Sequence, residues 1–282
     1  MTATVSELNP QSRSRSDRER FGDILALQRA AYLRDGAPSL TKRRSDLKKF
    51  KAAMLARRSA IEDAINTDFG HRSRHETALM EILGVVQGID YLVRNLRRFM
   101  RPTRRHIALD MRFGRNRIEY QPLGVVGVIS PWNYPVNLSL MPVVTAIAAG
   151  NRVMLKPSKL TPATNAVLAS MFSELFPEEQ VAMVSGDGSA FSSLPFDHLV
   201  FTGSTAVGRA VMKAASENLV PVTLELGGKS RPSSPRAACR TAPCPPSSGG
   251  SSSAAGRPAS PPTTPWCTSP RSTPSWRVTT GW

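Results

Sequence analysis

The amino-acid composition changes abruptly at Ser230. Residues 230–282 contain no Asp, Glu, Lys, Leu, Ile, Met, Phe or Tyr. With Val278 as its one aliphatic β-branched residue and three tryptophans, this stretch has too few apolar side chains to build a buried core. It also holds all three cysteines of the chain and 11 of its 23 prolines. We therefore expect one folded part over residues 21–229 and a disordered C-terminal tail over residues 230–282.

The net charge of +16 is divided unevenly between these two parts. Residues 230–282 carry six arginines and no acidic residue, which leaves +10 on residues 1–229. Nine arginines between Arg94 and Arg117 are opposed only by Asp110, and nucleic-acid binding is one interpretation of such a cluster. We favour a solvated face or a subunit contact instead, because charge alone is a weak signal.

The ends and the cysteines of the chain constrain its location. Residues 1–20 are polar and are expected to form a disordered tail, with neither a secretory signal nor an anchor. Apolar runs such as residues 143–149 are shorter than the ~20 residues of a membrane-spanning helix. Residues 1–229 contain no cysteine and no cysteine-based metal spacing, which fits a reducing compartment. We expect a soluble, cytoplasmic protein with no metal and no membrane partner.

Hydrophobic periodicity divides the folded part into a helical region and an α/β region. Apolar residues at three- and four-residue spacings predict helices within residues 40–66 and 76–99. Alternation over residues 106–120, with a Gly-Arg-Asn turn at 114–116, predicts a hairpin. Beyond Pro122, continuous apolar runs joined by helices indicate a parallel sheet, in which ligands bind at the carboxyl ends of the strands. The expected strands are 124–130, 152–156, 181–185, 198–201 and 221–226, and the expected helices are 137–149, 162–176 and 204–218.

Two candidate catalytic residues follow strands of this predicted sheet. Asn133 lies between the prolines of Pro131–Pro135, and its amide N–H groups can stabilise an oxyanion. Glu225 ends the last strand beside two glycines, and its carboxylate is a candidate general base. An ordinary turn and a salt-bridged glutamate are the simpler alternatives.

Candidate cofactor contacts follow two other strands. Lys156 ends a strand, where it can contact ribose hydroxyls or a phosphate, although a solvated lysine is the simpler interpretation. Gly203 and Ser204 lead into a helix whose free amides and positive dipole end suit a phosphate. This segment departs from the G-x-G-x-x-G pattern, so by itself it is a weak phosphate motif.

Four motifs in this order resemble the aldehyde dehydrogenase superfamily over about residues 21–230. They are PLGVVGVISPWNYP, LKPS, LPFDHLVFTGSTAVGR and LELGGK. The preceding helices, with Thr67–Gly70 and Glu76–Thr77, most resemble the fatty-aldehyde and coniferyl-aldehyde branch. The resemblance implies an α/β fold with an incomplete Rossmann-type cofactor domain preceded by helices. It also implies that residues 103–120 belong to an oligomer-forming region, with a homodimer for the intact protein.

The resemblance further implies oxidation of a small-molecule aldehyde to an acid with NAD or NADP, through a cysteine thiolate. Asn133 would stabilise the oxyanion and Glu225 would activate the deacylating water. By this resemblance, Lys159 occupies the position at which the family commonly has a glutamate that binds ribose hydroxyls. The positive charge of Lys159 favours the 2′-phosphate of NADP, but the sequence does not decide between NAD and NADP. The implied cofactor contacts are Trp132, Lys156, Ser158, Lys159, Gly203, Ser204 and Gly208.

The cysteine nucleophile of the family is missing from the sequence. The family motif Gly-Gln-x-Cys does not occur, and Cys239, Cys244 and Cys267 lie in unrelated contexts. Synonymous codons for residues 255–264 can be chosen so that a second reading frame, which begins at the third base of the Ala255 codon, encodes Gly-Gln-Ala-Cys-Val-Ala-Pro-Asp-Tyr. We hypothesise a reading-frame shift near Ser230, with a genuine low-complexity tail as the alternative. The chain as written is expected to be inactive, and a non-catalytic dinucleotide-binding fragment is the alternative function.

Overall fold

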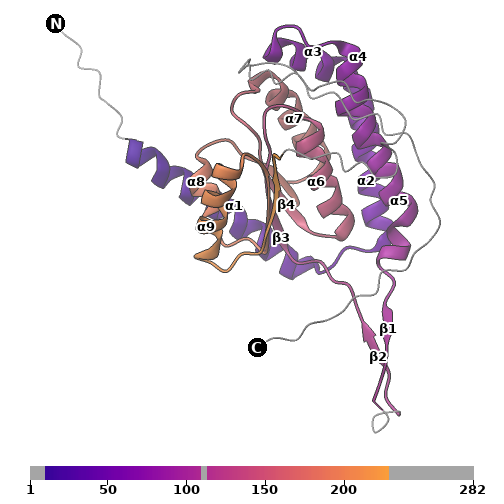
Figure 1. Cartoon of the computed structure of the whole chain (residues 1–282). Coiled ribbons are helices and arrows are strands. Elements are labelled where there is room, and N and C mark those ends of the chain that lie inside the picture. Colours follow the sequence, from indigo (N-terminus) through magenta and orange to yellow (C-terminus); the bar gives the residue numbers. More distant parts are fainter. Residues whose placement is uncertain (1–9, 109–112, 229–282) are drawn as a thin grey trace, which may run out of the picture. The chain divides into compact units, whose positions relative to one another are not determined.

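The computed structural model describes residues 10–108 and 113–228 (Figure 1). The expectations for residues 230–282, both the disordered tail and the shifted frame, lie outside the described residues. Within the described part, none of the helices has the length and apolar character that crossing a membrane requires.

Helix α1 (Pro10–Asp35) begins inside the segment that we expected to be a disordered tail. That prediction was wrong from Pro10 onward. The reason is tertiary packing, because Phe21 and Leu25 are buried in a core cluster with residues of the sheet and of the last helices. In addition, Asp17 accepts a hydrogen bond from the backbone amide of Asp187 at 2.9 Å, and Arg20 donates to the carbonyl of Ser185.

The helical region after α1 is confirmed, but it is divided differently from the prediction. The predicted helix over residues 40–66 is interrupted at Arg57, whose backbone leaves the helical region (φ −99°, ψ 13°). A π-helix, η1, follows a short helix in the second predicted segment, and periodicity did not predict it. The elements are α2 (Leu40–Ala56), α3 (Arg58–Phe69), α4 (Arg74–Glu76), η1 (Thr77–Leu83) and α5 (Gly84–Phe99).

The predicted hairpin is present, but its strands lie elsewhere. β1 (Thr103–Arg105) pairs antiparallel with β2 (Asn116–Ile118), and Arg104 lies opposite Arg117. β1 therefore precedes the alternating segment, and Asn116 belongs to a strand and not to the predicted turn. Alternation marks which side chains share a face but does not specify which residues pair.

A five-stranded parallel sheet forms the second half of the described part. Its strand order is β5-β4-β3-β6-β7, so the chain runs outward from β3 and then returns to the other side of β3. The order reverses between β3 and β6, which is the switch point where such sheets bind ligands. The strands are β3 (Val125–Ile129), β4 (Arg152–Lys156), β5 (Val181–Met183), β6 (His198–Gly203) and β7 (Val222–Leu226), and the helices are α6 (Asn137–Ala149), α7 (Pro162–Leu175), α8 (Gly188–Ser192) and α9 (Thr205–Ser216).

Each face of the sheet carries its own core, because successive side chains of a strand point to opposite faces. Val126, Val128 and Leu155 are buried in a cluster with α2, α5, α6 and α7. Val125 and Met154 are buried on the other face with α1, α8 and α9. Figure 1 shows the two sets of helices on either side of the sheet.

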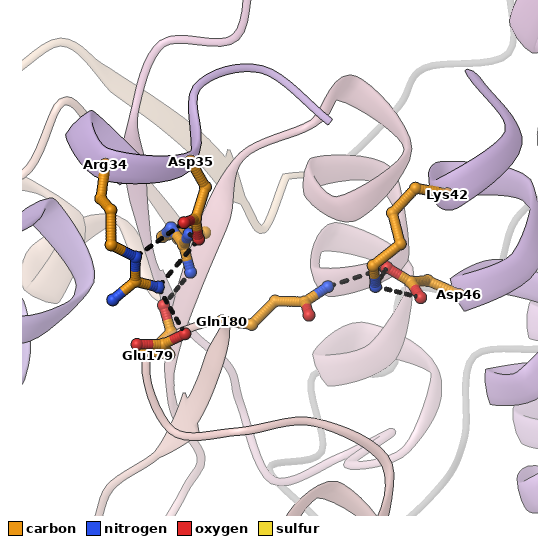
Figure 2. Close-up of polar contacts among 7 residues, drawn as sticks. Arg34, Asp35, Lys42, Asp46, Glu179 and Gln180 are labelled. Atoms are coloured by element: carbon orange, nitrogen blue, oxygen red, sulfur yellow. Dashed lines mark hydrogen bonds and ion pairs between the residues drawn. The ribbon is translucent and has the colours of Figure 1, made fainter. Parts of the chain in front are cut away.

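Ion pairs connect α1, and a hydrogen bond connects α2, to the amino ends of β4 and β5, as Figure 2 shows. Asp46 of α2 is 4% exposed, and its carboxylate accepts from Lys42 Nζ at 2.6 Å and from Gln180 Nε2 at 2.9 Å. Asp35 of α1 accepts from Arg152 Nη2 at 2.6 Å. These bonds fix the two helices against the sheet edge opposite the switch point.

Replacing Asp46 by alanine is expected to lower the free energy of unfolding by about 1–3 kcal/mol, because it leaves the amide of Gln180 without its buried acceptor. Urea unfolding followed by circular dichroism measures this change. Lys48→Ala on the exposed side of α2 is the matched control and should change the free energy by less than about 0.5 kcal/mol. Equal values for the two variants would contradict the buried network.

Candidate functional site

A cavity of about 870 Å³ lies at the switch point of the sheet. α6 packs over β3 and β4, and the same face of β6 and β7 is open to the cavity. Met141 and Ala146 of α6 form an apolar wall, and Val200 and Thr202 of β6 contribute to the floor. The cavity is therefore apolar on the helix side and polar toward the ends of the strands.

The two candidate catalytic residues both line this cavity. Asn133 lies in the loop between β3 and α6, and the exposed Glu225 lies near the end of β7. Trp132 also lines the cavity, and its ring stacks on Phe69 with the centroids 6.2 Å apart. The structure thus brings an amide group and a carboxylate to one cavity.

Gly203 and Ser204 line the same cavity, whereas Gly208 does not. Ser204 is the N-cap of α9, and its hydroxyl accepts from the Val207 amide at 3.4 Å. A Cβ atom at Gly208 would lie 2.7 Å from Leu226 Cδ2. Close packing of α9 on β7 therefore explains Gly208 without a ligand, while Gly203 and Ser204 stay at the cavity.

Lys156, Ser158 and Lys159 lie at the carboxyl end of β4, beyond the residues that line the cavity. Burial lowers the pKa of Lys156, the nearby charges of Asp187 and Asp17 act in the opposite direction, and the charge of Lys159 adds to the lowering. Ser158 organises the turn, because its hydroxyl accepts from the Leu160 amide at 3.2 Å. β4 neighbours β3, so Lys156 and the loop that carries Asn133 follow the carboxyl ends of adjacent strands, at one edge of the sheet. The charged neighbours of Lys156, which are Asp17 of α1 and Asp187 at the start of α8, belong to the face of the sheet opposite α6.

A buried carboxylate supports the loop that carries Asn133. Glu81 of η1 is 0% exposed, and its Oε2 accepts from the backbone amides of Val136 at 3.0 Å and Asn137 at 2.7 Å. Its Oε1 lies 3.4 Å from Arg72 Nη1, which donates to the carbonyl of Asn133 at 2.8 Å. Burial raises the pKa of Glu81 to about 7, although the two amides and Arg72 act in the opposite direction.

Metal binding has no support in the geometry of the described residues. Across residues 10–108 and 113–228, no group of three His, Cys, Asp or Glu side chains comes together as a potential metal site.

A sequence model described as the aldehyde dehydrogenase family matches residues 12–232, which is most of the chain. The chain belongs to the aldehyde dehydrogenase family. The resemblance carried by the four motifs is therefore confirmed, and so is the α/β fold that it implied.

Individual aldehyde dehydrogenases are similar to this chain in sequence and in structure. The probable coniferyl aldehyde dehydrogenase of Pseudomonas aeruginosa is 47% identical over 229 residues, which cover 80% of this chain and 48% of that protein. AldH of Staphylococcus aureus, solved in a substrate-bound state, has a TM-score of 0.71 and 33% identity over 74% of this chain and 46% of that one. An aldehyde dehydrogenase of Mycobacterium tuberculosis complexed with NAD+ has a TM-score of 0.64 and 31% identity over 73% and 43%. The chain spans about half the length of the relatives that it matches.

Residues that support the Asn133 loop and α7 were missed by reasoning from the sequence. Arg72 lies between the two predicted helical segments and Glu81 lies within the second, and nothing local signals that their partners in the β3–α6 loop lie more than 50 residues later. Asp68 was noted only as part of a family segment, yet its carboxylate caps α7 by accepting from the amides of Ala163 at 3.0 Å and Thr164 at 2.8 Å. Tertiary contacts of this kind leave no periodic signal.

The raised pKa of Glu81 predicts a pH-dependent stability. Between its ordinary value of 4.5 and about 7, the folded chain holds a proton that the unfolded chain releases, so the free energy of unfolding falls as pH rises through this window. The loss is on the order of 3 kcal/mol for a shift of this size. Glu81→Gln removes the titrating group, so the difference in stability between the variant and the original chain should change with pH in this window.

Urea unfolding at several pH values between 4.5 and 8 measures this difference. Glu178→Gln, which replaces an exposed carboxylate, is the control and should give no comparable change. A pH-independent difference between Glu81→Gln and the original chain would contradict the raised pKa.

Proposed function

We propose that this chain is the cofactor-binding part of an NAD- or NADP-dependent aldehyde dehydrogenase of the coniferyl-aldehyde type. The observation that carries the proposal is the switch-point cavity, which is lined by Asn133, Glu225, Gly203 and Ser204 and shares one sheet edge with Lys156. The similarity to relatives named coniferyl aldehyde dehydrogenase supports the choice of substrate class.

The residues at this edge fit a dinucleotide. The amides at the start of α9 and the positive end of its dipole suit a pyrophosphate. Lys156 supplies a partly desolvated ammonium, whose bond to a ribose hydroxyl or phosphate is stronger than it would be in water. Lys159 places a second positive charge nearby, which favours the 2′-phosphate of NADP.

The catalytic roles follow from the same arrangement. A bound nicotinamide would supply the hydride acceptor for oxidation of the aldehyde. Asn133 Nδ2 is placed to donate a hydrogen bond to the oxyanion that forms at the aldehyde carbon. Glu225 would accept a proton from the water that releases the acyl group from a cysteine thiol, a group that residues 1–238 do not supply. The apolar wall of α6 suits the hydrophobic part of an aldehyde and helps to exclude water from the reacting atoms.

A dinucleotide-binding fragment without catalysis is the second candidate. It is favoured by one sequence observation, since residues 1–238 contain no cysteine and therefore no thiol to act beside Asn133. In both candidates the cofactor site is the same, and only the reaction differs.

Calorimetric titration of the full chain with NAD and with NADP tests the cofactor site. Lys156→Ala is expected to weaken the affinity for either dinucleotide roughly 10-fold, which corresponds to the loss of one charge-assisted hydrogen bond. Lys159→Glu is expected to weaken NADP about 10-fold more than NAD. Lys48→Ala on α2 is the control, and an equal loss in all three variants would contradict the assignment.

A further inference from the structure

The loop that carries Asn133 is held from outside by one cluster of side chains. The cluster consists of Phe69, Arg72 and Glu81, which we call the loop brace. Phe69 ends α3, Arg72 lies between α3 and α4, and Glu81 lies in η1. The end of α3, the segment between α3 and α4, and η1 all precede the sheet in the chain, and their side chains meet at the loop between β3 and α6.

Arg72 contacts three consecutive residues of the loop, directly or through Phe69. Its Nη1 donates to the carbonyl of Asn133 at 2.8 Å. Its guanidinium lies 5.1 Å from the ring centroid of Tyr134 and 3.8 Å from that of Phe69, and Phe69 stacks on Trp132. The Arg72 side chain is only 12% exposed, so these interactions are largely shielded from competing water.

Glu81 holds the other end of the loop. Its Oε2 accepts from the amides of Val136 and Asn137 at the start of α6, and its Oε1 lies within 3.4 Å of Arg72. The Asn137 side chain donates back to the carbonyl of Met80 in η1 at 2.8 Å. π-Helical turns are rare and are frequent at functional sites, and here the turn brings Glu81 to the amides that begin α6.

We propose that Arg72 and Glu81 are positioning residues that hold the Asn133 side chain at the cavity. This inference rests on the proposed function of Asn133 as the oxyanion donor. The hydrogen bond from Arg72 to the Asn133 carbonyl restricts rotation of that peptide group. The hydrogen bonds from the Val136 and Asn137 amides to Glu81 restrict the backbone that follows Pro135. An oxyanion donor needs this restriction, because its orientation must be set before charge develops.

Charged groups around Glu81 determine how the loop brace responds to pH. Arg72 also lies 4.0 Å from Glu76, and Glu76 raises the pKa of Glu81 while Arg72 lowers it. On α3, Asp63 pairs with Arg74 and Asp68 caps α7. The exposed imidazoles of His71 and His75 lie on the same segment.

Nuclear magnetic resonance of the full chain tests the proposal through two signals. These are the indole N–H of Trp132, assigned by Trp132→Phe, and the side-chain amide of Asn133, assigned by Asn133→Ala. The indole N–H is expected to give one sharp signal and the side-chain amide one pair of sharp signals, and all of them should shift with a midpoint near pH 7. Arg72→Ala should broaden or split both signals, and Glu81→Gln should remove the pH response.

Two controls separate positioning from general support. Lys51→Ala removes a comparable ion pair, in which Nζ lies 2.7 Å from Asp90, and should leave both signals unchanged. The double variant His71→Asn, His75→Asn should keep the pH response if Glu81 is its origin. Unchanged Asn133 and Trp132 signals in both Arg72→Ala and Glu81→Gln would overturn the proposal, as would a response that vanishes with the two histidines.

Cofactor affinity distinguishes this inference from the proposed function. Arg72→Ala and Glu81→Gln leave Lys156 and the start of α9 intact, so their affinity for NAD and NADP should stay within about 2-fold of the original chain. If the unsubstituted chain binds neither NAD nor NADP, the proposed function is refuted. The role of the loop brace is then still tested by the Trp132 and Asn133 signals. If binding is intact and the signals do not respond, the loop brace alone is refuted.

Discussion

No NADH or NADPH is expected to form when this chain is mixed with NAD or NADP and an aldehyde. Asn133 and Glu225 line the cavity, but residues 1–238 contain no cysteine whose thiolate could attack the aldehyde. Removing a nucleophile from a catalytic unit costs on the order of 10⁶-fold in rate. The absorbance of the reduced nicotinamide should therefore rise no faster than in a control without protein.

Normal turnover by this exact polypeptide would contradict that expectation. The nucleotide sequence around Ser230 provides the complementary control. That sequence can reveal a second reading frame that encodes Gly-Gln-Ala-Cys where residues 255–264 are now read. In that case, a gene that keeps the present frame to about Ser230 and then continues in the second frame should regain the nucleophile and the activity. A single open frame that encodes only the present tail would refute the frame-shift hypothesis.

Replacing Phe50 by alanine is expected to lower the free energy of unfolding by about 3–5 kcal/mol. Phe50 of α2 is 0% exposed, and its ring lies 5.7 Å from that of Phe172 and 6.3 Å from that of Phe176. It therefore joins the helices that precede the sheet to α7, on the face of the sheet that also carries α6.

Urea unfolding measures this loss, and Leu33→Ala provides the control. Leu33 is 80% exposed on α1, so its truncation should change the free energy by less than about 0.5 kcal/mol. A loss below about 1 kcal/mol for Phe50→Ala would mean that α2 does not pack on α7 as described.

Much of the sheet was predictable because its strands are buried on both faces. Continuous apolar runs predicted β3 and β4 to within one residue at each end, and α6 was predicted over its observed span. The failures have different physical causes. The start of α1 was missed because contacts with distant residues near the sheet stabilise it. The helix α8 was missed because it is too short for periodicity to detect. The strands of the hairpin within residues 103–118 were misplaced because alternation does not specify their register.

The candidate site was predictable in its parts and not in its assembly. Asn133, Lys156 and Glu225 could be placed on one edge, because parallel strands end on the same side of a sheet. Which of them share the cavity depends on strand order, and order follows from how helices pack across the sheet. Arg72 and Glu81 were missed since their partners in the β3–α6 loop are set only by the folded arrangement.

The central claim is that a dinucleotide binds along the carboxyl edge of the five-stranded sheet. Mapping the amide signals of the full, isotope-labelled chain during titration with NAD and NADP tests it most directly. We expect saturable shifts at Lys156, Ser158 and Lys159, and also at Gly203 and Ser204, which lead into α9. Shifts confined to the arginine cluster of residues 94–117 would indicate binding by charge alone and would contradict the claim, as would the absence of any shift in a folded chain.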